Sequence, residues 1–264
     1  MNVGGKTVLL TGASGGLGRA IARRLAAAGA QVVLSGRRGD VLTQLASEIG
    51  GEVAPADLSD AAAVRELAAA HADVDVLVAN AGLPGSGRLE TFTEEQIERA
   101  LRVNLHAPIL LAHALTPRMV KRGLGHVVFM SSLNGKAPPA GTAIYSATKF
   151  GLRGFAGALR SDLHGTGVGV STIFPGFIRD AGMFADTDIK LPFYAGGTKT
   201  PEQVAEATLR AIERNRGEVD VAPVGLKVGS AISGIAPELS ATVTRKLGGH
   251  KLAAQFEHAQ QDKR

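Results

Sequence analysis

A tyrosine and a lysine stand four residues apart, at Tyr145 and Lys149, in a stretch that the sequence predicts to be a helix over residues 143–164. Residues four apart on a helix share one face, so the phenol and the ammonium would be neighbours. A nearby cation favours the ionised form of a phenol, whose ordinary pKa is about 10, and brings its proton exchange closer to neutral pH. A hydroxyl such as that of Ser132 could hold the substrate oxygen that exchanges this proton. The pair alone also fits an exposed helix turn, so this chemistry requires a cofactor site around it.

A glycine-rich turn separates the first predicted strand, residues 7–11, from a helix predicted over residues 19–28. A turn of this kind aims backbone N–H groups and the positive end of a helix dipole at one point, which suits a phosphate group. A merely tight turn is the alternative. The cofactor-binding residues predicted in it are Gly12, Ser14, Gly15, Gly16, Leu17 and Gly18.

The residues after the second predicted strand indicate which dinucleotide binds. A site for NAD places an acidic side chain there to hold the ribose 2′-hydroxyl, whereas an arginine accommodates the 2′-phosphate of NADP. The chain has Ser35-Gly36-Arg37-Arg38 at this place and no acidic residue. We therefore expect NADP(H) to be preferred over NAD(H), with Arg37 as the partner of the 2′-phosphate.

Strands and helices alternate along most of the chain, which predicts an α/β fold: a doubly wound (Rossmann) three-layer sandwich with a seven-stranded parallel sheet. One long helix, over residues 93–122, contains Pro108 and Pro117, which should kink or divide it. Ligands of such folds bind beyond the carboxyl ends of the strands. The predicted strands cover residues 7–11, 31–34, 52–55, 75–79, 126–130, 168–174 and 218–222.

Several motifs fall at these strand ends in a fixed order, from about Lys6 to Pro223. In this order the chain resembles the short-chain dehydrogenase/reductase family. The motifs that carry the resemblance are Thr11-Gly-x-x-x-Gly-x-Gly18, Asn80-Ala-Gly82, the four residues Asn104, Ser132, Tyr145 and Lys149, and Pro175-Gly176.

The resemblance implies hydride transfer between NADP(H) and a carbonyl or secondary alcohol. Tyr145 would exchange the proton with the substrate oxygen, to which Ser132 would hydrogen-bond. Lys149 would lower the pKa of Tyr145 and hold the nicotinamide ribose, and Asn104 would position a water that connects Lys149 to solvent. The cofactor contacts implied farther along the chain are Asp57 and Leu58 at the adenine, Asn80, Ala81 and Gly82 at the adenosine ribose, and Pro175, Gly176 and Ile178 at the nicotinamide.

Two positions near these motifs need comment. Ser131 should point to the opposite face of its strand from Ser132, which places it outside the site. The family carries a threonine where this chain has Asp180, so the usual carboxamide contact is in doubt and an ion pair of Asp180 with Arg179 is an alternative.

Residues 179–200 contain several large apolar side chains, which predict an apolar lid and therefore a hydrophobic or bulky substrate. These side chains could equally cover the core. The large side chains are Met183, Phe184, Leu191, Phe193 and Tyr194.

The domain organisation follows from length and composition. The 264 residues, 45% of them hydrophobic, suit one catalytic and dinucleotide-binding domain over residues 1–223. Residues 224–264 form a C-terminal extension, in which a helix should end at Gly248-Gly249. The extension is either packed on the domain or partly disordered, or its apolar stripe and basic flanks contact an anionic membrane or a neighbouring subunit.

Composition also excludes some classes of function. The chain has no cysteine, which excludes thiol chemistry and disulfides, and its seven histidines are dispersed, so no metal is expected. The net charge of +5 comes from scattered residues, so we expect no nucleic-acid partner. We expect a cytoplasmic homodimer or homotetramer acting on a small molecule. A redox sensor that binds NADP(H) without turnover, and a peripheral membrane or interaction protein, are the competing functions.

Overall fold

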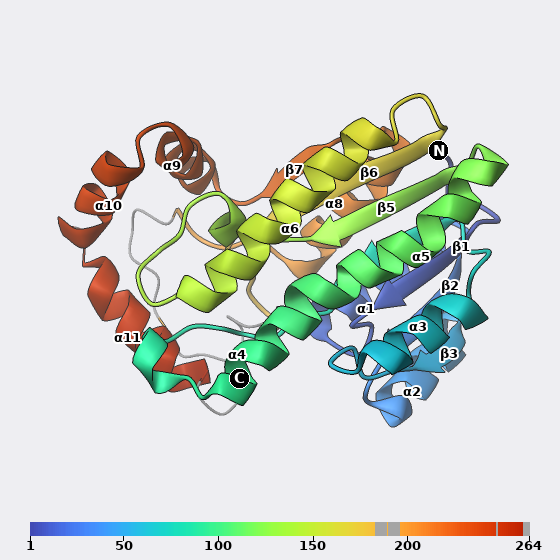
Figure 1. Ribbon diagram of the computed structural model, residues 1–264, viewed down its shortest axis with the longest axis horizontal. Coiled ribbons are helices and arrows are strands. Elements are labelled where there is room, and N and C mark those ends of the chain that lie inside the picture. Colours follow the sequence, from blue (N-terminus) through green and yellow to red (C-terminus); the bar gives the residue numbers. More distant parts are fainter. Residues whose placement is uncertain (183–188, 190–195, 247, 261–264) are drawn as a thin grey trace.

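The computed structural model describes residues 1–182, 189, 196–246 and 248–260. Its centre is a sheet in the strand order β3-β2-β1-β4-β5-β6-β7, in which every neighbouring pair is parallel (Figure 1). The order runs outward from β1 in one direction and from β4 in the other, which confirms the doubly wound fold. The strands are β1 Thr7–Thr11, β2 Gln31–Gly36, β3 Glu52–Pro55, β4 Val76–Ala79, β5 Gly125–Met130, β6 Val168–Pro175 and β7 Glu218–Val221.

Helices cover both faces of the sheet because successive strand residues point to opposite sides. In β1, Val8 and Leu10 pack in one core cluster and Leu9 in the other. The first cluster is completed by α1 (Gly16–Ala27), α2 (Gly39–Ile49) and α8 (Pro201–Glu213). The second is completed by α3 (Ala61–Ala70), α5 (Ala107–Arg122) and α6 (Ala143–Asp162). Three layers result, as predicted.

The helix predicted over residues 93–122 is divided. It consists of α4 (Glu94–Leu101), a π-helical segment η2 (Arg102–His106) and α5. The division lies just before Pro108, which occupies the first turn of α5, where the backbone N–H that proline lacks has no helical partner. Pro117 lies inside α5 without ending it. The π-helical segment contains Asn104, which is 1% exposed.

Three helices follow the last strand: α9 (Val224–Ile235), α10 (Pro237–Lys246) and α11 (Gly249–Gln260). The sequence predicted a helix that ends at Gly248-Gly249, and α10 does end at Lys246, just before these glycines. A further helix, α11, then begins at Gly249. The three helices form an arc beyond the carboxyl ends of the strands (Figure 1). In the part of the chain that the structure describes, no helix is long and apolar enough to cross a membrane.

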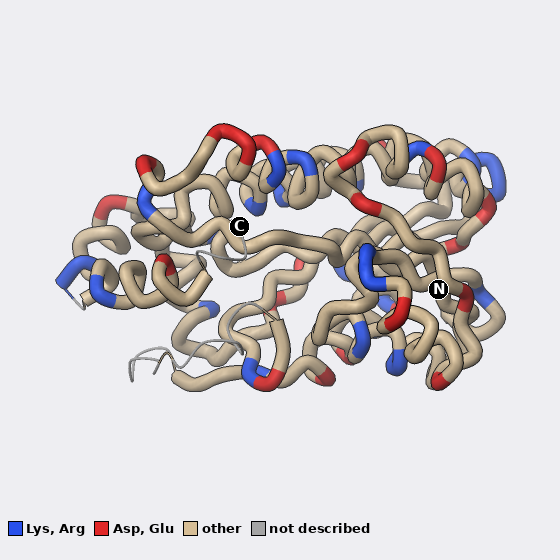
Figure 2. The backbone as a smooth tube through the Cα atoms, turned by 90° about the horizontal axis from the view of Figure 1, so that it is seen from below, with Lys and Arg blue, Asp and Glu red and all other residues tan. Residues whose placement is uncertain are grey.

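Basic and acidic residues are interspersed along the backbone rather than gathered in one large region (Figure 2). Several of them are paired between elements. Arg24 of α1 contacts Glu206 of α8 at 2.7 Å, and Arg23 contacts Glu48 of α2 at 2.6 Å. These pairs are partly exposed, so each stabilises the packing of the helices only modestly.

A histidine is buried in the middle of the sheet. His126 of β5 is 2% exposed, and its Nε2 lies 2.8 Å from the hydroxyl of Ser171 on β6. Burial, with smaller contributions from the N-terminal ammonium and Arg160, lowers the pKa of His126 from 6.5 to about 3. Between these two values the unfolded chain binds a proton that the folded chain does not, so stability falls as the pH drops.

We expect His126→Gln to reduce this acid sensitivity. For the wild-type protein the histidine should cost about 2–3 kcal/mol of unfolding free energy at about pH 4.5 relative to neutral pH. Urea unfolding at the two pH values measures the difference, which should shrink in His126→Gln. His113→Gln, on the exposed face of α5, is the matched control and should keep the wild-type difference. An equal fall in wild type and His126→Gln would contradict the assignment.

Candidate active site

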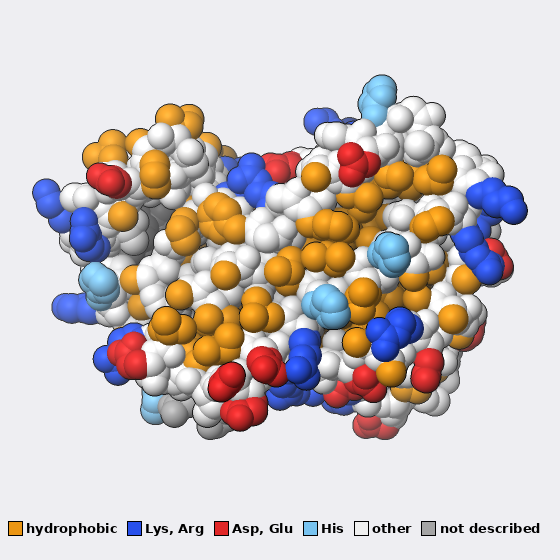
Figure 3. All heavy atoms as spheres, viewed as in Figure 1, with side chains coloured by type: hydrophobic (Ala, Val, Ile, Leu, Met, Phe, Trp, Pro, Cys, Tyr) orange, Lys and Arg blue, Asp and Glu red, His pale blue; other side chains and the backbone are white. Residues whose placement is uncertain are grey.

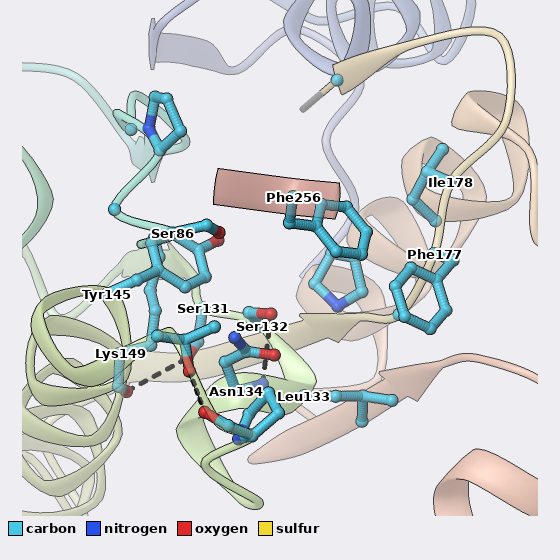
Figure 4. A pocket seen from close by; sticks show the side chains of 18 of the residues that line it. Ser86, Ser131, Ser132, Leu133, Asn134, Tyr145, Lys149, Phe177, Ile178 and Phe256 are labelled. Carbon is cyan, nitrogen blue, oxygen red and sulfur yellow. Dashed lines mark hydrogen bonds between the residues drawn. The ribbon is translucent and has the colours of Figure 1, made fainter. Parts of the chain in front are cut away.

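A cavity of about 1810 Å³ lies at the carboxyl ends of the strands. It runs from the glycine turn after β1, past the ends of β4, β5 and β6, to the helices α9, α10 and α11. Every residue predicted to bind the cofactor lines it, as do Ser132, Tyr145 and Lys149, whereas Asn104 lies behind its wall. Figure 4 shows the part around Tyr145, with Phe177 and Phe256 on the side opposite the phenol.

The glycine turn is shaped by close approaches of backbone to backbone. Gly12 has a φ of +66°, and a Cβ on it would stand 2.7 Å from the Cα of Ala81. A Cβ on Gly18 would meet the carbonyl oxygen of Gly12. These two positions therefore require glycine, and the turn stays open enough for a ligand to reach the N–H groups at the start of α1.

The two arginines after β2 have different surroundings. Arg38 donates from Nη2 to the carbonyl oxygen of Ser14 at 2.5 Å, so it holds the glycine turn from outside. Arg37 is exposed at the rim of the cavity. Its charge also acts on Asp57: loss of water tends to raise the pKa of this carboxyl, but two hydrogen bonds from Ser59, together with Arg37 and Arg99, lower it below its ordinary value. Arg37 and Arg99 together form a cationic rim. The sequence predicted Arg37 but not Arg99, because Arg99 lies on a helix far along the chain.

Asn80 joins the ends of two neighbouring strands. Its Nδ2 donates to the carbonyl oxygen of Thr11 at 3.0 Å and to that of Gly12 at 3.3 Å. The backbone N–H groups of Asn80 and Ala81 both donate to the Thr11 hydroxyl. This set of bonds fixes the glycine turn against the end of β4.

Ser132, Tyr145 and Lys149 meet at the floor of the cavity. Ser132 follows β5, while the other two project from α6 (Figure 4). The Ser132 hydroxyl is hydrogen-bonded to the Tyr145 phenol and accepts a bond from the N–H of Asn134 at 3.2 Å. The Lys149 ammonium donates to the carbonyl oxygen of Met130 at 2.9 Å and lies 5.5 Å from the centre of the Tyr145 ring. A phenol, a hydroxyl and an ammonium are thus assembled as the sequence predicted.

The pKa of Tyr145 differs from the sequence prediction. Burial raises the pKa of Tyr145 from 10.0 to about 12, and the Ser132 hydrogen bond lowers it only in part. In the protein without a ligand the net direction is therefore upward, opposite to the expected lowering. The Lys149 ammonium bonds to the carbonyl oxygen of Met130. A lowering by Lys149 within this balance stays a prediction. Burial lowers the pKa of Lys149 itself from 10.5 to about 8, so it remains protonated at neutral pH.

Asn104 is bonded to the loop that follows β4. Its Oδ1 accepts from the N–H of Leu83 at 2.7 Å, and its Nδ2 donates to the carbonyl oxygen of the same residue at 3.0 Å. The π-helical segment directs this side chain inward. Its predicted role with a bound water stays a prediction, while its contacts show that it fixes the cavity wall at Leu83.

Ser131 lines the cavity, although the sequence placed it outside the site. Its hydroxyl donates to the carbonyl oxygen of Lys149 at 3.1 Å. Gly135 makes this packing possible, since a Cβ there would stand 2.6 Å from the Ser131 hydroxyl and 2.7 Å from the Lys149 carbonyl oxygen. Sequence reasoning did not single out Gly135, because a single glycine in a loop carries no pattern.

The chain after β6 closes on itself at the base of the predicted lid. Ile178 pairs with Lys199, and Lys199 exchanges backbone hydrogen bonds with Phe177 and Arg179 at 2.9 Å each. Arg179 Nε lies 3.4 Å from Asp180 Oδ2, which confirms the predicted ion pair. Asp180 has a φ of +64°, a conformation that aspartate tolerates better than most residues. The five large apolar residues of the predicted lid lie outside the described residues.

Helix α11 forms a wall that the sequence did not predict. Its Phe256 ring stacks on Phe177 with ring centres 6.1 Å apart, and its Glu257 lies 3.6 Å from Arg88. The contacts reach two separate parts of the domain, the chain after β6 and the chain after β4. No pattern in the C-terminal residues alone indicates which surface they cover. Among the described residues, no group of three or more acidic or histidine side chains could hold a metal ion.

The sequence of residues 6–191 matches the family model described as short chain dehydrogenase. The chain belongs to the short-chain dehydrogenase/reductase family. It is 38% identical over 226 residues to the ketoacyl reductase HetN of Nostoc sp., covering 82% of this chain and 78% of that protein. It is 37% identical over 178 residues to the NADP-dependent 3-hydroxy acid dehydrogenase YdfG of Escherichia coli, covering 65% and 72%.

A solved structure of a short-chain dehydrogenase from Sphingobium yanoikuyae in complex with NADPH has the same fold, with a TM-score of 0.76 and 30% identity. The match covers 89% of this chain and 94% of the other. The resemblance inferred from the motifs is therefore confirmed at the level of the family.

A network of ion pairs fixes the turn that follows Ser132. Lys136, which follows the turn η3 (Leu133–Gly135), lies 2.6 Å from Asp220 and 3.0 Å from Glu218 of β7. Glu218 also binds Arg153 of α6 at 2.7 Å, so the network joins the Ser132 turn to the helix of Tyr145. Lys136 is a positioning residue, because it contacts Asp220 and Glu218 and not the phenol of Tyr145.

We expect Lys136→Met to lower kcat by about tenfold to a hundredfold, because misplacing the Ser132 hydroxyl disturbs the reacting geometry. Steady-state rates and cofactor titration measure the effect, and the Kd of the cofactor should change little. Lys136→Arg should recover most of the rate. Lys121→Met, exposed at the end of α5, is the control. Unchanged turnover in Lys136→Met, or an equal loss of cofactor affinity, would remove this role.

Proposed function

We propose that the protein is an NADP(H)-dependent oxidoreductase that interconverts a carbonyl and a secondary alcohol. The observation that carries the proposal is the group of Ser132, Tyr145 and Lys149 on the floor of a cavity that continues to the glycine turn. The family supports the class of reaction, and the named relatives and the NADPH complex support the cofactor.

The residues around the glycine turn fit a dinucleotide. Backbone packs so closely at Gly12 and Gly18 that neither position has room for a Cβ, and the turn shaped in this way lines the cavity with the exposed Arg37 at its rim. When bound, the nicotinamide supplies or accepts the hydride. The residues that would hold the cofactor are Gly12, Ser14, Gly15, Gly16, Leu17, Gly18 and Arg37 at the phosphates, Asp57 and Leu58 at the adenine, Asn80, Ala81 and Gly82 at the adenosine ribose, and Tyr145, Lys149, Pro175, Gly176 and Ile178 at the nicotinamide end.

Tyr145 acts as the acid in reduction. Its pKa of about 12 keeps the phenol protonated at neutral pH, and Ser132 orients the phenol and the substrate oxygen toward each other. After donation, the phenolate lies close to the Lys149 ammonium, which is protonated at neutral pH because its pKa is about 8. Lys149 can then stabilise the phenolate, and a water held near Asn104 would return the proton. In oxidation the same steps run in reverse.

The walls beyond Tyr145 favour a hydrophobic or bulky substrate. They are formed largely by apolar side chains from the loop after β5 and from the C-terminal helices. The described apolar residues that line this end are Leu133, Phe177, Leu226, Ile232, Leu252 and Phe256. Two relatives are named for ketoacyl and hydroxy acid substrates, and the hydrocarbon part of such a substrate could contact these apolar side chains.

A redox sensor without turnover is the weaker candidate, because a sensor has no need for Ser132, Tyr145 and Lys149 together.

We place the protein in the cytoplasm. We also propose that it is a homodimer or homotetramer that pairs through α5 and α6. The face that carries these helices is rich in apolar side chains (Figure 3). Exposed Phe150 of α6 and Val120 of α5 are examples.

We expect Tyr145→Phe to lose turnover by a factor of at least about 10² while the affinity for NADPH is kept, because the variant lacks only the proton donor. A panel of aldehydes and ketones of graded size, followed by the absorbance of NADPH, provides the assay. Ser161→Ala, on the exposed surface of the same helix, is the control and should be fully active. Undiminished turnover in Tyr145→Phe would remove Tyr145 from this role.

We expect Arg37→Ala to weaken NADPH binding by about tenfold or more and to leave NADH binding nearly unchanged, because only the first carries the 2′-phosphate. Fluorescence titration of both cofactors measures the two affinities. Arg38→Ala is the informative comparison, since Arg38 holds Ser14 and its loss should weaken both cofactors alike. Equal affinities of the wild-type protein for NADPH and NADH would refute the preference.

A further inference from the structure

Helix α9 carries an apolar stripe on the side that faces away from the cavity. Val224, Val228, Ala231 and Ile235 follow one another at steps of four, three and four residues, the spacing that keeps side chains on one face of a helix. Val224 is 75% exposed, Val228 53% and Ile235 87%. None of the four lines the cavity, which is lined instead by Leu226, Gly229 and other residues of the opposite face. In the part of the chain that the structure describes, the stripe is therefore exposed surface and not part of the cavity lining.

The apolar surface continues to the mouth of the cavity. Ile232 of α9 and Leu239 and Val243 of α10 line the cavity and are still 46%, 61% and 47% exposed. A substrate that enters past these side chains thus passes an apolar rim that is continuous with the outer stripe. Large exposed apolar patches of this kind mark sites of contact with proteins or membranes.

Charge beside the stripe selects between these two partners. Between residues 224 and 260 the chain has four basic side chains, Lys227, Arg245, Lys246 and Lys251, against two acidic side chains, Glu238 and Glu257, and the second of these is paired with Arg88. Helix α9 contains no acidic residue. Figure 3 shows the apolar side chains over α9 and the basic ones at the adjoining edge over α10. An anionic lipid surface is complementary to these basic side chains.

We propose that the outer face of α9, with the basic residues of α10 and α11 beside it, docks the protein on an anionic membrane surface. The stripe of Val224, Val228, Ala231 and Ile235 enters the boundary between headgroups and acyl chains, and Lys227, Arg245, Lys246 and Lys251 contact the headgroups. The rim of the cavity then faces the lipid, from which an apolar substrate can enter. The docking surface does not rest on the proposed reaction, since none of its stripe residues contacts the catalytic group.

Co-sedimentation of the full chain with vesicles tests the proposal. One set of vesicles is phosphatidylcholine alone, and the other contains roughly one third phosphatidylserine. The wild-type protein should sediment with the second set at low salt, less with the first, and less with either at high salt. Val228→Glu/Ile235→Glu should lower the partition coefficient by at least about tenfold. Ala69→Glu, an exposed apolar position on α3, should bind as wild type does.

Three results would overturn the proposal. The wild-type protein could stay in the supernatant with both kinds of vesicle, or the double variant could bind as well as wild type. In the third, the wild-type protein does not bind vesicles but forms an oligomer that the double variant cannot form. The stripe would then be a contact between copies of the chain. Turnover of the double variant with a water-soluble substrate, and its melting temperature, should equal those of wild type, which separates a docking defect from loss of the fold or of the activity.

Discussion

The burial of Lys149 is the constraint on which the site depends. Lys149 is 3% exposed, and its ammonium donates a hydrogen bond to the carbonyl oxygen of Met130 at 2.9 Å. A buried charge without such a partner would cost far more than the fold could offset, so the end of β5 must lie where it does. That position in turn places Ser132, two residues after Met130, beside the phenol that precedes Lys149 by one helical turn.

The rest of the site follows from holding strand ends and turns at this one edge. The hydroxyl of Ser131 and the missing side chain of Gly135 let the turn after β5 lie against the backbone of Lys149. Asn80 ties the glycine turn to the end of β4, and Asn104 ties the next loop to the π-helical segment. Asn80 and Asn104 also bond the backbone of Gly12 and Leu83, which lie outside the helices and strands, and such bonds fix irregular chain around a cavity.

The fold and the position of the catalytic group were predictable because both follow from local patterns. Short buried strands alternate with helices, and a parallel sheet brings all their carboxyl ends to one edge, so Ser132 and Tyr145 had to meet the glycine turn there.

Three features lay beyond such patterns. The π-helical segment holds the buried Asn104, and the prolines predicted a break in the helix but not its form. Helix α11 is placed by contacts of Phe256 and Glu257 with residues far away in the chain. The pKa of Tyr145 depends on how completely the phenol is buried, which helical spacing does not reveal.

Tyr145, half-buried on the floor of the cavity, is the acid of the proposed reaction, and the positive charge of a bound NADP⁺ would favour its phenolate. The chain has only two tyrosines, so Tyr194→Phe leaves Tyr145 as the single phenol, and the absorbance of its phenolate can be titrated with circular dichroism as a check on folding. Without cofactor, the phenol should stay protonated at pH values above its ordinary pKa of 10.0. It should ionise only near pH 12, or when the protein unfolds in alkali. With NADP⁺, whose nicotinamide is cationic, it should ionise at clearly lower pH. A phenol that titrates at its ordinary value in the free protein, or at the same pH with and without NADP⁺, would contradict the account.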